Sequence, residues 1–258
     1  DTTDGRTRIV VGLPVDNIDF EDIAVGPCPD LSGPCVFVAD TGDNDGDRDV
    51  VFVHAFPEPD VSQVKPAQAD DEETSVRVDL EAVWTMPLVF PDGAHPNIEA
   101  LAVLPDATAM LLFEKVEGER ARIYAYRAPW TTQNPDAADL GARTAELTGS
   151  IEVPASVGDD KERRITAASL HWSGTRLLLR TTGAILEYSA TDASGFFDLI
   201  GRAPRQQVVS PPDEEQGEAI THDGAGTAWL SISEIKKKRE KAGETPILHR
   251  LDCSVAAP

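Results

Sequence analysis

Long apolar runs, basic residues and aromatic residues are all scarce in this 258-residue sequence. No apolar run approaches the roughly 20 residues that a membrane-spanning helix needs, so we expect no membrane span. The 45 acidic residues outnumber the 23 basic ones, which gives a formal net charge of −22. Such a surface repels phosphodiesters and attracts cations, so the composition argues against nucleic acid as a partner. A purely solubilising role for the acidic surface stays open.

Cysteine is also rare, with three residues in the whole chain. Cys28 and Cys35 lie in the segment GPCPDLSGPC, whose Pro and Gly residues indicate a turn, and we predict a disulfide between them. Two unpaired thiols in a cytosolic protein are the alternative. Cys253 has no obvious partner, and the spacing lacks the second Cys/His pair of a zinc site. The disulfide and an N-terminus at Asp1 rather than Met predict a secreted, periplasmic or cell-surface protein whose leader has been removed.

Helical periodicity is missing as well, whereas short strand-like runs bounded by Gly, Pro, Asp and Asn recur along the chain. The segment EIKKKREKAGE, residues 234–244, is charged on every side and is predicted to be an exposed loop between strands. We therefore predict an all-β fold.

One phrase recurs: NIDFEDIAVGP, PNIEALAVLP and EQGEAITHDG each place a glutamate before a short apolar strand. The glutamates are Glu21, Glu99 and Glu218, and RRITAASLHWSG carries Thr166 at the same point. Successive spacings are 78, 67 and 52 residues, and the interval from Glu218 through the C-terminus back to Glu21 is 61. Four similar intervals predict a four-bladed β-propeller over residues 1–258 as a single domain. The polar segment 61–75 is interpreted as an insertion.

Each repeat contains four predicted strands, except the last. The predicted strands are 22–27, 36–42, 50–56 and 76–90; then 99–105, 109–115, 122–128 and 146–153; then 167–172, 176–182, 185–190 and 199–209; and finally 219–224, 227–233 and 247–253. The segment TRIVVGLP, residues 7–14, precedes Glu21 much as TGSIEVP precedes Thr166. We therefore predict that the N-terminal strand completes the last blade and closes the ring.

The innermost strands of a propeller line its channel, so Glu21, Glu99 and Glu218 should converge on the axis. Carboxylates this close need a neutralising charge. One solution is a divalent cation, with Thr166 filling the position without a glutamate, and a wide irregular ring suits Ca²⁺ better than Mg²⁺. The second strands supply further polar groups to the channel at Asp40, Lys115, Arg180 and Glu234. In the rival interpretation Glu99 pairs with Lys115, and another carboxylate with Arg180, as a salt-bridge plug.

Other motifs are less informative. The run DTGDNDGDRD lacks the EF-hand pattern and is predicted to be a tight turn in which Asp and Asn cap backbone amides. His95 and His222 flank the glutamate phrases at different offsets and are predicted to be loop residues rather than metal ligands. No nucleophile elbow, zinc-protease helix or phosphate loop is present, so the sequence leaves open whether the protein is an enzyme.

The glutamate phrases, together with ADTGDN, FPEP, LLLRTTG and SISE in this order, resemble a group of bacterial extracytoplasmic propellers. Most members of that group have no known function, and some are similar to phytase-like or esterase-like domains. The resemblance spans nearly the whole chain and implies a propeller fold. Phytase-like propellers usually have six blades, whereas this sequence contains strands for only four, so their catalytic activity does not transfer.

Three functional hypotheses follow. The first is a calcium-binding propeller that acts as a binding or scaffold module for a protein or small-molecule ligand. The second is a metal-dependent phosphoesterase or lactonase in which Glu21, Glu99 or Glu218 acts as general base. The third is a protein-interaction platform whose axial charges are structural. In each case we expect a monomer.

The closure scheme predicts that deletion of residues 7–14 lowers the melting temperature, because it would open the last blade. Thermal unfolding followed by circular dichroism tests this expectation. An unchanged melting temperature would contradict the closure scheme.

Overall fold

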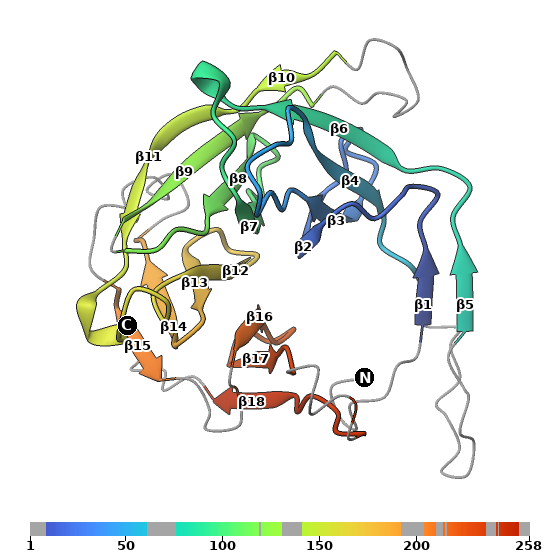
Figure 1. Ribbon diagram of the computed structural model, residues 1–258. Helices are drawn as coiled ribbons and strands as arrows, with labels where there is room; N and C mark the ends of the chain where they lie inside the picture. Colours follow the sequence, from blue (N-terminus) through green and yellow to red (C-terminus); the bar gives the residue numbers. More distant parts are fainter. Residues whose placement is uncertain are drawn as a thin grey trace.

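The structure is a computed structural model that describes residues 9–60, 76–118, 120–130, 141–191, 204–209, 214, 216–235, 241 and 243–252. The regular elements in these ranges are β-strands and two short 3-10 helices, η2 (Pro91–Gly93) and η3 (Ala155–Val157). Figure 1 shows four blades around a common axis, so the predicted all-β, four-bladed propeller is confirmed. The described part of the chain contains no helix with the length and hydropathy required to cross a membrane.

The blades follow one another along the chain, and their strands match the predicted segments closely. Blade 1 contains β2 (Phe20–Pro27), β3 (Pro34–Asp40), β4 (Val51–Pro57) and β6 (Trp84–Val89), with the short β10 (Arg143–Thr144) beside β6. Blade 2 contains β7 (Ile98–Val103), β8 (Ala109–Glu114), β9 (Arg120–Arg127) and β11 (Glu146–Glu152). Blade 3 contains β12 (Ile165–Leu170), β13 (Arg176–Thr181), β14 (Ala184–Ser189) and β15 (Gln206–Val209). Blade 4 contains β16 (Gly217–His222), β17 (Ala228–Ser233) and β18 (His249–Asp252).

The hydrophobic core lies between the blades. Along β8, Met110 and Leu112 belong to the cluster shared with blade 1, whereas Leu111 and Phe113 belong to the cluster shared with blade 3. Successive side chains of a strand point to opposite faces, and here both faces are covered. Successive residues of β8 are therefore apolar because both faces of the strand are packed against neighbouring blades.

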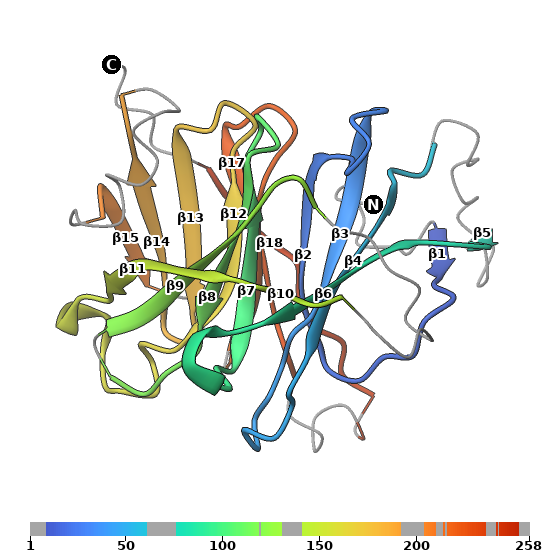
Figure 2. The ribbon, with the colours of Figure 1, turned by 90° about the horizontal axis from the view of Figure 1, so that it is seen from above.

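The N-terminal strand does not close the ring, so this part of the prediction is wrong. β1 (Ile9–Gly12) pairs in parallel with β5 (Val76–Asp79), and Figures 1 and 2 show this ribbon projecting beside blade 1. Val11 and Leu13 pack with Phe56 and its neighbours on the face of blade 1 that is turned away from blade 2. Burial on this face holds the N-terminal segment at blade 1. In the described residues, blade 4 consequently has three strands.

Several predictions concern residues that lie outside the described ranges. These are the polar insertion at 61–75, the central part of the charged segment 234–244, Thr7 at the start of the proposed closing strand, and Cys253.

Every innermost strand contains a β-bulge at the repeated motif. The register shifts between Phe20 and Asp22 in β2, and at the corresponding points of β7, β12 and β16. The residues skipped by the four ladders are Glu21, Glu99, Thr166 and Glu218. A bulge turns the extra side chain out of the regular alternation. The four sequence repeats are thus structurally equivalent, since each has its bulged residue at the same position.

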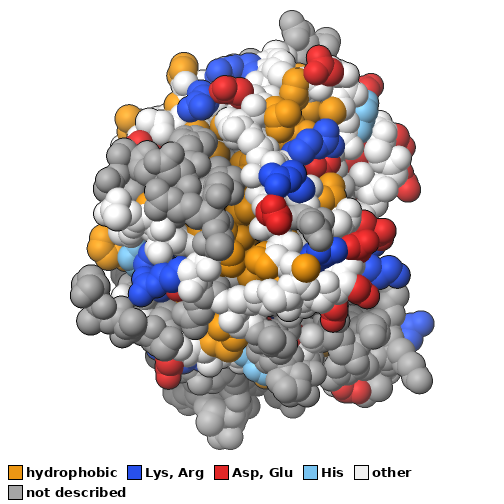
Figure 3. All heavy atoms as spheres, turned by 90° about the vertical axis from the view of Figure 1, so that its left-hand side faces the viewer, with side chains coloured by type: hydrophobic (Ala, Val, Ile, Leu, Met, Phe, Trp, Pro, Cys, Tyr) orange, Lys and Arg blue, Asp and Glu red, His pale blue; other side chains and the backbone are white. Residues whose placement is uncertain are grey.

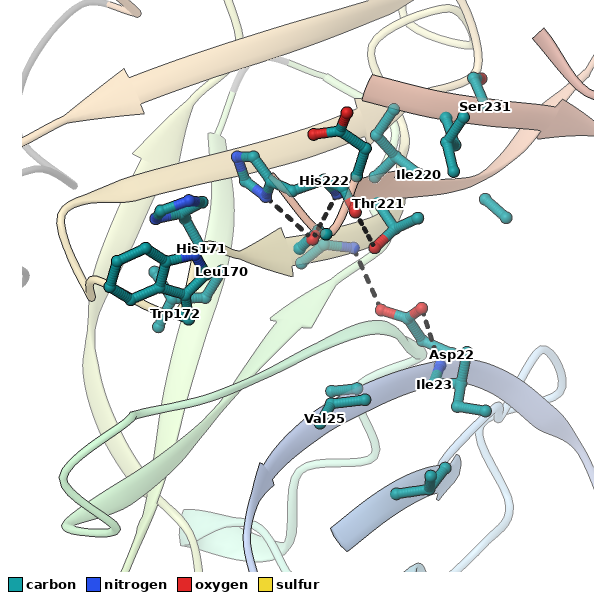
Figure 4. Close-up of a pocket in the computed structure, with 18 of the residues that line it drawn as sticks. Asp22, Ile23, Val25, Leu170, His171, Trp172, Ile220, Thr221, His222 and Ser231 are labelled. Carbon is teal, nitrogen blue, oxygen red and sulfur yellow. Dashed lines mark hydrogen bonds between the residues drawn. The ribbon is translucent and has the colours of Figure 1, made fainter. Parts of the chain in front are cut away.

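Asp22, the residue after the first bulge, joins three blades. Its Oδ2 accepts hydrogen bonds from the backbone N–H of Leu101 in β7 at 2.8 Å and of Ala168 in β12 at 3.1 Å. Its Oδ1 accepts one from the N–H of Ile23 at 2.8 Å. The inner edges of β7 and β12 face the axis, so this carboxyl group supplies acceptors that no strand provides. Figure 4 shows Asp22 on β2, with its carboxyl group directed towards the backbone of β12.

We expect Asp22→Ala to lower the free energy of unfolding by about 2 to 4 kcal/mol, because two inter-blade N–H groups lose their acceptor. Urea denaturation of the variant and the wild type measures the difference. Asp45→Ala, at an exposed loop position, is the matched control and should change stability little. Equal midpoints for the Asp22 variant and the wild type would show that this carboxyl group does not hold the blades together.

Candidate functional site

Carboxylates gather at one end of the axial channel, where the bulged residues project. Gly42 makes room for two of them: a Cβ at this position would lie 2.3 Å from both Asp19 Oδ2 and Glu21 Oε1. The electrostatic influence of Glu99 and Glu218 reaches Glu21, as does that of Lys115. The three predicted glutamates and Asp19 thus influence one another electrostatically, and we call this group of carboxyl groups the acidic mouth.

Amide side chains support two of the glutamates from the position two residues earlier in the chain. Asn97 Nδ2 donates to Glu99 Oε1 at 2.9 Å, and Gln216 Nε2 donates to Glu218 Oε1 at 2.7 Å. The corresponding residue in blade 1 is Asp19, which adds negative charge instead of a donor. Repulsion between carboxyl groups is therefore strongest around Glu21.

One basic side chain enters this acidic group. Lys115 Nζ forms an ion pair with Glu99 Oε2, as the plug interpretation proposed. Arg180 pairs with another carboxylate, as the same interpretation proposed: this is Glu214, at 2.5 Å, and both side chains are almost completely buried. Ser231 Oγ also donates to Glu214, at 3.1 Å. Glu214, the partner of Arg180, was not predicted from the sequence, and the charge of Glu218 also acts on Arg180.

The remaining predicted channel residues have other hydrogen-bond partners. Thr166 Oγ1 donates to the carbonyl oxygen of Gly217 at 2.7 Å, which ties blade 3 to blade 4. Asp40 pairs with Arg48 at 3.1 Å. Glu234 Oε2 accepts a bond of 2.9 Å from Gln216, so it adjoins the mouth. Within the described residues, no three His, Cys, Asp or Glu side chains are already placed together as metal ligands.

The glutamates hold their protons more tightly than usual. Burial, followed by the charges of Glu99 and Asp19, raises the pKa of Glu21 to about 8. Burial also raises the pKa of Glu99 and of Glu218, although hydrogen bonds from neighbouring side chains oppose the shift. Burial and mutual repulsion thus disfavour a full set of ionised carboxylates in the mouth, and either protons or a bound cation would relieve this repulsion.

The loop after β3 behaves as predicted for a turn. Asp43 Oδ1 accepts the backbone N–H of Asp47 at 2.9 Å, and Gly46 has φ 69°. The backbone N–H of Asp43 donates to Asn97 Oδ1 at 2.7 Å. The loop thereby fixes the amide that supports Glu99.

The two histidines differ from each other. His95 lies in the loop before β7, as predicted, whereas His222 is the last residue of β16 rather than a loop residue. Its Nδ1 lies 3.2 Å from Ser169 Oγ. Burial and the neighbouring His171 lower the pKa of His222 to about 3, which makes it a weak general base for this serine.

The predicted disulfide between Cys28 and Cys35 is present. It closes the turn between β2 and β3, the hairpin that carries Glu21 and Asp22. The sequence analysis missed Asp19, Asn97 and Gln216. A signal was available, because each of them stands two residues before a repeated glutamate.

No family model matches the sequence, and no curated protein does. Solved structures with a similar fold include a proposed 6-phosphogluconolactonase from Bacteroides uniformis, with 11% identity and a TM-score of 0.45 over 91% of this chain and 68% of that one. A periplasmic gluconolactonase from Pseudomonas aeruginosa has 10% identity and a TM-score of 0.41 over 91% and 58%. Sqt1 from Chaetomium thermophilum has 14% identity and a TM-score of 0.38 over 89% and 45%. The chain thus spans only about half of the last two proteins, and similarities this low carry no argument about activity.

The raised pKa of Glu21, about 8 against 4.5, predicts how stability depends on pH. The folded state keeps a proton that the unfolded chain releases, so this contribution is complete below pH 4.5 and is lost as the pH rises through 8. We expect Glu21→Gln to be stabilised relative to the wild type at pH 8.5 and to lose that advantage at pH 4. Chemical denaturation of both proteins across this range, without divalent cations, measures it. Parallel pH profiles would contradict the raised pKa.

Proposed function

We propose that this protein is an extracytoplasmic binding module whose axial mouth holds a divalent cation, with calcium preferred over magnesium. The supporting observation is the excess of carboxyl groups: Asp19, Glu99 and Glu218 act electrostatically on Glu21, and Lys115 forms its ion pair with Glu99 alone among these four residues. Like charges this close repel one another strongly unless a cation or protons compensate. A cation is the compensation that these oxygen donors favour chemically.

Lys115 now occupies the place next to Glu99 that a cation would use. Its side chain is flexible and 19% exposed, so it can withdraw towards solvent when a divalent ion arrives. The ion would also displace the proton from Glu21. The side-chain amides of Asn97 and Gln216 donate their N–H groups to Glu99 and Glu218 and so orient these two carboxyl groups for an ion.

Charge on the outer blades is arranged differently. Arg120 pairs with Glu152 at 2.8 Å on blade 2, and Arg127 pairs with Glu146 at 2.7 Å. Figure 3 shows acidic and basic side chains next to one another on the side of the molecule that faces left in Figure 1. This pairing favours the axial mouth over the outer strands as the place where a cation binds.

The disulfide supports a location in an oxidising compartment, outside the cytoplasm. Free calcium is available there to a site of modest affinity, since extracellular calcium modules typically bind with dissociation constants of about 10⁻⁴ to 10⁻³ M.

Calorimetric titration with Ca²⁺ at pH 7, in two buffers of different ionisation enthalpy, tests the proposal. We expect binding that releases close to one proton, because Glu21 is largely protonated before the ion arrives. Glu218→Gln should weaken binding about tenfold or more, whereas Glu81→Gln, at an exposed position, should not. Mg²⁺ should bind more weakly than Ca²⁺.

Lys115→Met removes the competing ammonium group and should strengthen Ca²⁺ binding about tenfold, as the same titration would measure. The opposite result is equally informative. If neither the wild type nor this variant binds Ca²⁺, the mouth is a salt-bridge plug and the cation proposal fails.

A further inference from the structure

A second feature, separate from the mouth, is an open cleft between blades 1 and 4. Neighbouring inner strands pack along the sequence β2, β7, β12 and β16, but β2 and β16 make no comparably extensive contact. A cleft of about 680 Å³ separates them, with β12 as its floor. Figure 4 shows its two sides, with Ile23 and Val25 on one and Thr221 and His222 on the other.

The walls of this cleft are apolar and unusually open to solvent. Ile23 and Val25 are 62% and 58% exposed, although they lie on an innermost strand. The corresponding strand of blade 2 is buried along its whole length. Ala219, Ile220 and Leu248 face them from blade 4. Trp172, 73% exposed, stands at the rim. Exposed apolar surface of this extent is typical of a binding site.

Apart from two histidines, the ionisable residues in the described lining of the cleft are all acidic. They are Asp22 on the floor, Glu58 at one end and Asp223, which already pairs with Arg250. No Lys or Arg belongs to the described lining. A second apolar hollow continues along β2 from Asp22 and Ile23, and its charged lining residues are Glu21 and Asp22. The two imidazoles do not offset this charge, because burial lowers the pKa of both His171 and His222.

We propose that this cleft binds an amphipathic organic cation, an amine with an apolar body. The body lies between Ile23 and Val25 on one wall and the blade 4 wall on the other, and the ammonium group faces Asp22. Oδ2 of Asp22 already accepts two backbone N–H groups, whereas Oδ1 accepts one and keeps lone-pair capacity for an ammonium group. Apolar walls reject inorganic ions, and acidic lining groups reject anionic amphiphiles, so the two features together select this class. The site differs from the axial mouth and does not depend on calcium.

Three probes with one apolar body separate charge from hydrophobicity: 4-phenylbutylamine, 4-phenylbutanol and 4-phenylbutyrate. Calorimetric titration of the full chain at pH 7, with and without Ca²⁺, measures their binding. We expect the amine to bind about tenfold more tightly than the alcohol, the carboxylate to bind least, and Ca²⁺ not to abolish amine binding. Equal affinities for all three, or no binding of the amine, would overturn the proposal.

Val25→Lys places a fixed ammonium group on the exposed wall and should weaken amine binding about tenfold or more. Leu147→Lys makes the same change at a similarly exposed position of β11 on blade 2 and is the control. Asp22→Ala is avoided here because Asp22 also holds the blades together. Unchanged amine binding in a folded Val25→Lys variant would place the amine elsewhere and refute the site. Loss of Ca²⁺ binding in Glu218→Gln with amine binding intact would confirm that the two sites are distinct.

Discussion

The carboxyl group of Asp22 is the interaction on which the arrangement of the blades depends. Innermost strands of a propeller present one edge to the channel, where no further strand can pair with them. Asp22 accepts N–H groups from the innermost strands of blades 2 and 3 and thereby links three of the four blades. Burial among these strands raises its pKa to about 7, so the acceptor for blade packing is also a poorly solvated acid.

The bulges give Asp22 a different environment from the glutamates that are the candidate site residues. Glu21 and Asp22 are adjacent in sequence, yet Glu21 is skipped by the strand ladder and reaches the mouth, whereas Asp22 stays between the strands. The same irregularity recurs at Glu99 and Glu218. Three blades therefore deliver one carboxylate each to the same end of the channel, and blade 3 delivers Thr166, which binds a neighbouring carbonyl. Repulsion between carboxyl groups at the mouth is therefore a direct consequence of the repeat.

Most of the fold could be predicted because local patterns determine it. Short apolar runs between turn residues defined the strands, and a recurring phrase marked the start of each blade, with a glutamate in three copies and Thr166 in the other. Closure could not be predicted in the same way. The apolar residues around Val11 suit either an outer strand of blade 4 or the uncovered face of blade 1, and the structure places them on blade 1. β2 and β16 stay apart in the same structure, and the cleft lies between them.

The amino-acid sequence alone determined the class of fold, the number of blades and the disulfide, since each depends on spacing and residue type. Only the tertiary structure decided how the charges pair. Lys115 joins Glu99, whereas Arg180 joins Glu214, a residue outside any repeat. It also decided that Asp22 bridges blades and that Ile23 and Val25 stay exposed. Such outcomes depend on distances between strands far apart in the chain, which no local pattern encodes.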